Sequence, residues 1–252
     1  MKQFFLATVL VACLATSASA DDIIFLSANA LESSVRELIL PFEKTSGHTV
    51  KVSFGNVSNN AERVRKGDSV DLAITSPQLR ADLQAEGKIA AEPNVVIAKV
   101  GFGVFVKKGA QKPDISSVDA FKRAVVGAKS IAVGDPQKGS PVGAYILPLF
   151  DRLEIGEQVK PKLQLSGGGA QTFESVVKGE AELGFSLTSE IAANPDVELV
   201  ALLPEQIQNF IVLTVVLPVQ AKAPDAAKAF VAFLKTQDAR RVMMARGLQP
   251  GG

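Results

Sequence analysis

Short apolar runs rich in β-branched residues alternate with amphipathic stretches along almost the whole sequence. Near the start, Ile23–Leu26 is followed by a small polar segment and then by the amphipathic stretch Leu31–Lys44. The same order returns at once, with Thr49–Phe54 as a strand, residues 55–60 as a polar loop and Ala61–Lys66 as the start of a helix. Nearly continuous apolar strands joined by helices are typical of mostly parallel sheets covered on both faces. The sequence therefore predicts an α/β fold with mostly parallel sheets and helices on both faces.

The rest of the chain continues this alternation. Further strands are predicted at Ser69–Ser76, Ser130–Val133, Lys162–Leu165 and Leu183–Leu187. Further helices are predicted at Gln78–Glu86, Val118–Ala124, Ala144–Leu153, Gln171–Gly179, Pro224–Lys235 and Ala239–Arg246. The last helix is stopped by a glycine with a proline just beyond, a usual helix ending.

Two long apolar runs flank the middle third of the chain. Asn94–Lys108 is long enough to pass from one domain into another, and Phe210–Leu217 is a continuous apolar strand that would make the return crossing. A chain of 252 residues can bury two modest cores. We therefore expect two lobes joined by hinge strands, with a cleft between them. Residues 21–99 and 211–252 would form lobe 1, and residues 100–210 would form lobe 2.

The first 20 residues have the pattern of a secretory signal peptide. A basic start is followed by the apolar run Phe4–Ala15 and by Ala18–Ala20, which predicts cleavage before Asp21. No later run approaches the length of about 20 apolar residues that a spanning helix needs. We expect an exported protein of the periplasm. The segment Leu10–Cys13 also resembles a lipoprotein cleavage box, so a lipid anchor at Cys13 is the alternative.

Charge and cysteine content exclude several classes of function. Without the signal peptide and its Lys2, the chain has 26 basic and 26 acidic residues. A neutral chain with both signs scattered argues against nucleic acids or anionic membrane surfaces as partners. The only cysteine lies in the signal peptide, so the mature chain has no thiol nucleophile and no cysteine ligand for a metal. We expect no metal and no cofactor.

Small polar residues follow the first two predicted strands. Asn29 and Ala30 lie in the polar segment after the first strand, and Asn56, Val57 and Ser58 lie in the loop after the second. At the carboxyl ends of parallel strands, free backbone N–H groups and the positive ends of helix dipoles favour an anion. We therefore expect both loops to bind a ligand. Asparagine and serine are also favoured N-cap and turn residues, so capping alone is the alternative.

The second half of the chain offers more candidate ligand-binding residues. The segment 137–143 presents another helix N-terminus, where Ser140 and the backbone at Val142 would be donors. Gly168 lies in a run of three glycines, which either cradles an anion or is a flexible connector. This run is no phosphate loop, because the Gly-Lys-Ser/Thr ending is missing. Thr188 follows a predicted strand and either faces the cleft or caps the next helix.

Other polar residues have structural interpretations. The sole histidine, His48, has no partner for a metal site or a catalytic triad, and we expect it in a surface turn. Asp71 and Asp135 are expected to cap the backbone. Tyr145 is expected in the core with a hydrogen-bonded hydroxyl. Lys138 is either a countercharge for the ligand or a solvated loop residue.

Several segments of the chain resemble the periplasmic solute-binding proteins of ABC importers, in their molybdate-binding-protein-like branch. The matching segments are Phe25–Leu31, Phe54–Asp71, Val133–Pro136 with Pro141–Tyr145, Gly179–Phe185, Leu187–Ser189, Ala227–Lys235 and Ala239–Pro250. Gly-Asp-Pro followed by Pro-x-Gly-x-Tyr is the most specific of these motifs. The resemblance implies a two-lobe type II binding fold, a monomer that closes on a small anion, and an ABC permease of the inner membrane as partner.

Three departures from that family bear on the ligand. The family usually has serine where this chain has Ala30 and Val57, and molybdate binders have a tyrosine where it has Leu187. A small organic carboxylate is therefore as good a candidate as a tetrahedral oxyanion. Some relatives of this branch are aconitate isomerases, which interconvert the cis and trans acids. That enzymatic alternative needs a base and cationic partners for carboxylates, and Lys138 is the lysine best placed for it.

Overall fold

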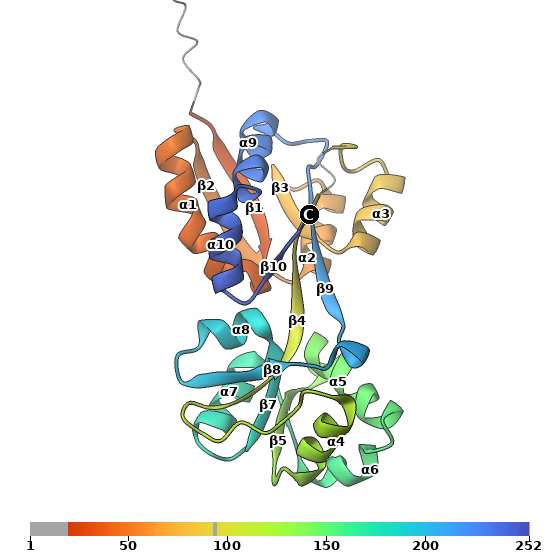
Figure 1. The fold of residues 1–252 in the computed structure, drawn as a ribbon. Coiled ribbons are helices and arrows are strands. Elements are labelled where there is room, and N and C mark those ends of the chain that lie inside the picture. Colours follow the sequence, from red (N-terminus) through yellow and green to blue (C-terminus); the bar gives the residue numbers. More distant parts are fainter. Residues whose placement is uncertain (1–19, 93–94, 252) are drawn as a thin grey trace, which may run out of the picture.

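Two strands run between two groups of helices and strands in the computed structural model, which describes residues 20–92 and 95–251 (Figure 1). They are β4 (Val95–Lys107) and β9 (Phe210–Val216). Both were predicted as crossings between lobes, and the two-lobe α/β fold class is confirmed. The boundaries proposed after residues 99 and 210 remain predictions.

Lobe 1 is built around three parallel strands in the order β2-β1-β3: β2 (Thr49–Gly55), β1 (Asp22–Ala28) and β3 (Leu72–Thr75). The helical segments of this lobe are η1 (Asn29–Leu31), α1 (Glu32–Ser46), α2 (Val57–Lys66), α3 (Pro77–Ala85), α9 (Pro224–Leu234) and α10 (Gln237–Ala245). Side chains of β1 alternate between the two faces. Phe25 meets Phe230 of α9 edge-on at 5.6 Å, whereas Leu26 packs in a separate cluster with Ala61 of α2. Helices therefore cover both faces, as predicted.

Lobe 2 repeats this arrangement with the strand order β6-β5-β7. Its strands are β5 (Ile131–Gly134), β6 (Leu163–Ser166), β7 (Leu183–Leu187) and β8 (Val197–Leu202). Its helical segments are α4 (Val118–Gly127), η2 (Pro136–Lys138), α5 (Pro141–Arg152), α6 (Gly156–Val159), η3 (Lys160–Lys162), α7 (Gly169–Val177), α8 (Thr188–Ala193) and η4 (Glu205–Ile207). Strand β8 and the short strand β10 (Gln249–Pro250) were not foreseen from the sequence.

The sheets are mixed rather than purely parallel. Every antiparallel pairing of the described strands involves β4 or β9, which run against β3, β7, β8 and β10 or against each other. The parallel strands predicted from the sequence thus form the centre of each lobe, and the crossing strands add the antiparallel part. Since β4 pairs with strands of both lobes, one continuous sheet runs through the molecule.

The crossing is packed tightly around the middle of β4. A side chain at Gly101 or Gly103 would displace a neighbouring leucine, since an added Cβ would lie 2.9 Å from Leu202 Cδ2 and 2.7 Å from Leu199 Cδ1, respectively. Between them, Phe102 exchanges two hydrogen bonds with the side chain of Gln208, of 2.9 and 3.1 Å.

Tyr145 of α5 also belongs to this crossing. Its ring stacks on Phe102 at 4.7 Å, and its hydroxyl donates to the carbonyl oxygen of Ile207 at 2.6 Å. The predicted hydrogen bond of the tyrosine hydroxyl is confirmed, whereas the side chain is half-buried against the core rather than inside it.

One predicted loop is wrong. Residues 55–60 were expected to be irregular, but α2 begins at Val57. The Asn56 side chain accepts a hydrogen bond from the Asn59 N–H at 2.7 Å, so that asparagine starts the helix at once. Asn60 is buried, and its amide donates to carbonyls of Ser27 and Ile74, which fixes α2 against the sheet.

Predictions about the signal peptide and Cys13 fall on residues outside the described part of the chain. Within the described part, the helices are too short or too polar to cross a lipid bilayer.

Candidate functional site

The carboxyl ends of the parallel strands meet at one edge of each lobe. In lobe 1 these ends are Ala28, Gly55 and Thr75, and in lobe 2 they are Gly134, Ser166 and Leu187. The two edges face each other, because α8, which follows β7, contacts η1, which follows β1 (Figure 1). Open α/β sheets bind ligands at such edges.

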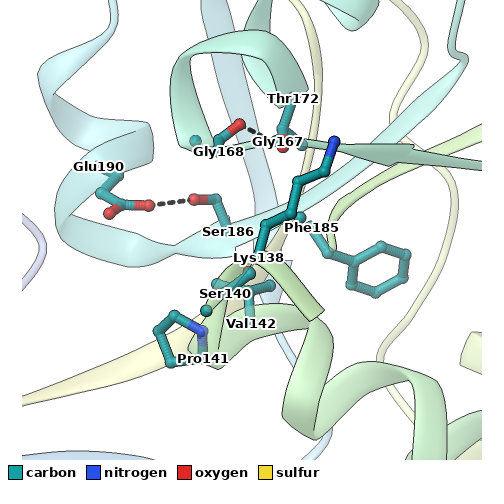
Figure 2. A pocket seen from close by; sticks show the side chains of 13 residues that line it. Lys138, Ser140, Pro141, Val142, Gly167, Gly168, Thr172, Phe185, Ser186 and Glu190 are labelled. Carbon is teal, nitrogen blue, oxygen red and sulfur yellow. Dashed lines mark hydrogen bonds between the residues drawn. The ribbon is translucent and has the colours of Figure 1, made fainter. Parts of the chain in front are cut away.

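A cavity of about 160 Å³ lies at this edge of lobe 2 (Figure 2). Its walls come from the turn between η2 and α5, the glycine turn before α7, and the junction of β7 and α8. The residues that line it include Lys138, Ser140, Val142, Gly167, Gly168, Gly169, Thr172, Ser186 and Glu190.

The first wall is the N-terminus of α5. Ser140 is the N-cap, and its hydroxyl oxygen accepts from the N–H of Gly143 at 3.2 Å. Pro141 has no N–H, so the N–H of Val142 is left with no acceptor among the described residues. An added Cβ at Gly143 would lie 1.9 Å from the carbonyl oxygen of Gly134, so only glycine lets the helix start this close to β5.

The second wall is the N-terminus of α7. The N–H of Gly167 donates to Gln171 Oε1 at 2.7 Å. The N–H groups of Gly168 and Gly169 have no acceptor among the described residues. These two donors and the helix dipole favour an anion at this end of the cavity. The glycine run is thus the start of a helix at a cavity rather than a free connector.

The two charged side chains of the cavity carry opposite signs. Lys138 runs past Gly167, and its ammonium group has no hydrogen-bond or ion-pair partner in the described part of the chain. Glu190 lies on the other side of the cavity, where its carboxylate accepts a hydrogen bond from the Ser186 hydroxyl. No ion pair joins Lys138 to Glu190 among the described residues.

A second cavity, of about 510 Å³, lies between the lobes. Asn29, Ala30 and Ser33 line it from lobe 1, and Ser189 and Glu190 line it from lobe 2. Because Glu190 lines both cavities, the two spaces adjoin. The buried hydroxyl of Ser189 has no hydrogen-bond partner within residues 20–92 and 95–251.

The structure brings together only part of the predicted site. Lys138, Ser140, Val142 and Gly168 share the first cavity, and Asn29 and Ala30 line the second.

Asn56, Val57 and Ser58 follow β2 at the facing edge of lobe 1 and line neither cavity. Thr188 donates to the carbonyl oxygen of Gly247 at 2.6 Å instead of facing either cavity. Ligand contact by the residues of the predicted site, inside or outside these cavities, stays a prediction.

Sequence reasoning missed Thr172, Ser186 and Glu190. Ser186 lies inside the buried strand β7, where alternation with apolar neighbours gave no reason to single it out. Glu190 occupies the first turn of α8, where an acidic residue is expected only to favour the helix dipole. Glu190 follows Lys138 by 52 residues in the sequence, and only the tertiary fold brings the two into the same cavity.

The other polar residues have the structural roles predicted for them. Asp71 Oδ2 accepts from the N–H of Ile24 at 2.8 Å, and its other oxygen accepts from backbone N–H groups of the segment before α9. Asp135 Oδ1 accepts from the N–H of Gln137 at 2.9 Å. His48 accepts from the N–H of Asp21 at 3.2 Å in the turn before β2. The described residues contain no cluster of three side chains suited to hold a metal ion.

Two lobes linked by crossing strands, with polar cavities at the facing strand ends, define the class of binding proteins that hold a solute between lobes. The sequence profile of the bacterial extracellular solute-binding proteins matches residues 23–249. The chain belongs to this family, and it resembles the molybdate-binding members of it.

Individual relatives extend this result. The chain is 29% identical to an aconitate isomerase of Pseudomonas sp. over 89% of its own length and 86% of that protein. It is 26% identical to the molybdate-binding protein ModA of Rhodobacter capsulatus, over 96% of this chain and 93% of that protein. A solved substrate-binding domain from Clostridium difficile superimposes with a TM-score of 0.80 at 19% identity, covering 92% of this chain and 99% of that domain. That structural likeness concerns the fold alone.

Proposed function

We propose that this protein captures a small anion at the facing edges of its lobes and delivers it to an ABC permease. In this proposal the protein works in the periplasm as a monomer. The ligand would sit against the lobe 2 cavity and reach the second cavity, so that it touches both lobes. Because a ligand with contacts to both lobes binds the closed arrangement better, binding and closure would be linked.

The observation that carries the proposal is the convergence of unsatisfied donors on one cavity. The Lys138 ammonium and the N–H groups of Val142, Gly168 and Gly169 have no acceptor among the described residues. Such donors lose little by being desolvated when an anion accepts from them, and a charged hydrogen bond is worth about 1.5–3 kcal/mol. An anion is the ligand that uses all of them.

Two observations favour a small carboxylate over molybdate. Ala30, which stands where the family usually has serine, lines the interlobe cavity with a methyl group and no hydroxyl. Glu190 adds a negative charge next to the anion-binding donors, which disfavours an ion with negative charge on every side. A carboxylate keeps its charge at one end of the molecule.

Calorimetry of the purified protein tests this proposal. Molybdate, tungstate, sulfate, citrate, cis-aconitate and trans-aconitate would be titrated under one buffer and salt condition. We expect a carboxylate to bind more tightly than either metal oxyanion. Nanomolar molybdate affinity would overturn the preference for a carboxylate, and no binding of any of these anions would overturn the capture of small anions.

A second candidate function is isomerisation of aconitate. The observation that favours it is that one cavity holds both a carboxylate, Glu190, and an ammonium, Lys138. Glu190 would remove a proton from the methylene carbon beside the double bond. The double bond would shift, and Glu190 would return the proton to the carbon at its other end. Lys138 would hold a substrate carboxylate and stabilise its charge.

This second function is tested by proton NMR of cis-aconitate incubated with the wild-type protein. Formation of the trans acid that stops in both Glu190→Gln and Lys138→Ala would establish the enzyme. Binding of aconitate without turnover by the wild type would leave the carrier function and exclude the enzyme.

A further inference from the structure

Glu190 stands out in a cavity whose other polar groups are suited to an anion. Its carboxylate lies close enough to the glycine turn that an added Cβ at Gly169 would be 3.7 Å from Glu190 Oε2. Lys138 flanks the same turn, since an added Cβ at Gly167 would be 3.7 Å from Lys138 Nζ. A positive and a negative group therefore border one short segment from two sides of the cavity (Figure 2).

On the Glu190 side of the lobe 2 cavity, the polar side chains of Ser186 and Glu190 present acceptors. Ser186 is buried, and its hydroxyl proton is already donated to the Glu190 carboxylate. An ionised carboxylate has no proton to give and can accept several hydrogen bonds. The one bond from Ser186 leaves the rest of this capacity open, because no other described residue donates to Glu190. A ligand that brings only acceptors would leave this wall unsatisfied and be repelled by it.

We propose that the cavity is selective for hydroxycarboxylates, whose carboxylate binds to Lys138 and the N–H groups of Val142 and Gly168 while their hydroxyl donates to Glu190. This inference rests on the proposed capture of a small anion and names the class of that anion. The charges of the two side chains cancel, and the N-termini of α5 and α7 add positive potential. A ligand of net negative charge therefore fits this cavity better than a zwitterion. For this reason the group of the ligand that donates to Glu190 should be a hydroxyl rather than an ammonium.

The test compares three acids with one carbon skeleton: L-malate, which has a hydroxyl, succinate, which has hydrogen in its place, and L-aspartate, which has an ammonium. Sulfate serves as an anion without a donor. Affinities for the full-length mature protein would be measured by calorimetry. We expect malate to bind about 10- to 100-fold more tightly than succinate, the range for a hydrogen bond to a charged group. Aspartate and sulfate should also bind more weakly than malate.

The variant Glu190→Gln keeps the size of the side chain and removes its charge. We expect it to reduce the malate-to-succinate ratio by about tenfold and to raise the affinity for sulfate, because the repulsive carboxylate is gone. The matched control is Glu174→Gln on the exposed face of α7, which pairs with Lys178 and lines neither cavity. It should leave all four affinities unchanged.

The outcomes separate this inference from the proposed function. Succinate or sulfate binding as tightly as malate, aspartate binding most tightly, or an unchanged ratio in Glu190→Gln would each overturn the inference while anion capture stands. No binding of these ligands, together with none in the wider anion panel, would overturn the capture of small anions itself.

Discussion

The hydroxyl of Thr188 donates to the carbonyl oxygen of Gly247 at 2.6 Å, and this bond joins the two lobes. Thr188 is the first residue of α8 in lobe 2, whereas Gly247 lies in the turn between α10 and β10 of lobe 1. Gly247 has a φ of 74°, and an added Cβ would lie 2.4 Å from the carbonyl oxygen of Thr188. The contact therefore depends on a positive φ at residue 247 and on a close approach of its backbone to that of Thr188, and glycine permits both.

Replacing Gly247 with alanine should separate the lobes. The new methyl group meets the backbone of α8, and the positive φ itself costs a non-glycine residue about 1–3 kcal/mol. We expect a larger radius of gyration by small-angle X-ray scattering and a lower melting temperature.

The matched control is Gly179→Ala. Gly179 has a φ of 79°, and an added Cβ there has nothing within 4 Å. This variant should lose stability from backbone strain alone and keep the wild-type radius. An equal radius in both variants would show that the Gly247 contact does not hold the lobes together.

Saturation with a bound anion should compact the protein. Glu190 of lobe 2 and Asn29 of lobe 1 line the same interlobe cavity, so a ligand reaching it draws the lobes together about β4 and β9. Scattering with and without the tightest anion of the calorimetric panel would show a smaller radius of gyration when bound. Confirmed binding with an unchanged radius would rule out closure about these strands.

Loss of the Lys138 ammonium should weaken anion binding. In Lys138→Ala we expect a loss of about 1.5–3 kcal/mol, or roughly 10- to 100-fold in affinity, as for other charged hydrogen bonds. The melting temperature should hardly change, because this exposed side chain has no partner among the described residues. Lys178→Ala, on the exposed face of α7, is the control, and equal affinities in both variants would contradict a ligand-binding role for Lys138.

Gly143→Ala should damage both stability and binding. The methyl group would overlap the Gly134 carbonyl oxygen, so α5 must move away from β5 and take the Val142 N–H with it. Overpacking of this kind costs about 1–3 kcal/mol, measurable by urea unfolding, and calorimetry should show weaker anion binding. Gly127→Ala in α4, with nothing within 4 Å of an added Cβ, should be close to neutral. Wild-type stability in Gly143→Ala would contradict the close approach of helix and strand.

The parts of the fold set by local patterns were predictable from the sequence. The apolar runs of β4 and β9 were long enough to identify the crossings, and Asp71 and Tyr145 have the structural roles expected of such residues. The start of α2 was missed because Asn56 favours a turn and a helix cap equally, and only the neighbouring sheet decides between them.

The candidate site was predictable only in part, because some of its residues meet through contacts between segments that lie far apart in the sequence. Ser140 and Gly168 lie at strand-to-helix junctions, which a sequence reveals directly. Glu190 reaches the cavity through the pairing of β7 with β5, a contact between distant segments with no local signal. Thr188 was placed at the correct strand end, but its bond to Gly247 spans 59 residues.

Strand β4 also has a consequence for how the molecule unfolds. It pairs with β9 and β10 on one side of the crossing and with β7 and β8 on the other, and one apolar core continues through both lobes. If either lobe melted alone, β4 would lose half of its partners and expose apolar side chains of the remaining half. The lobes are therefore thermodynamically coupled, and heating should melt both in a single cooperative transition.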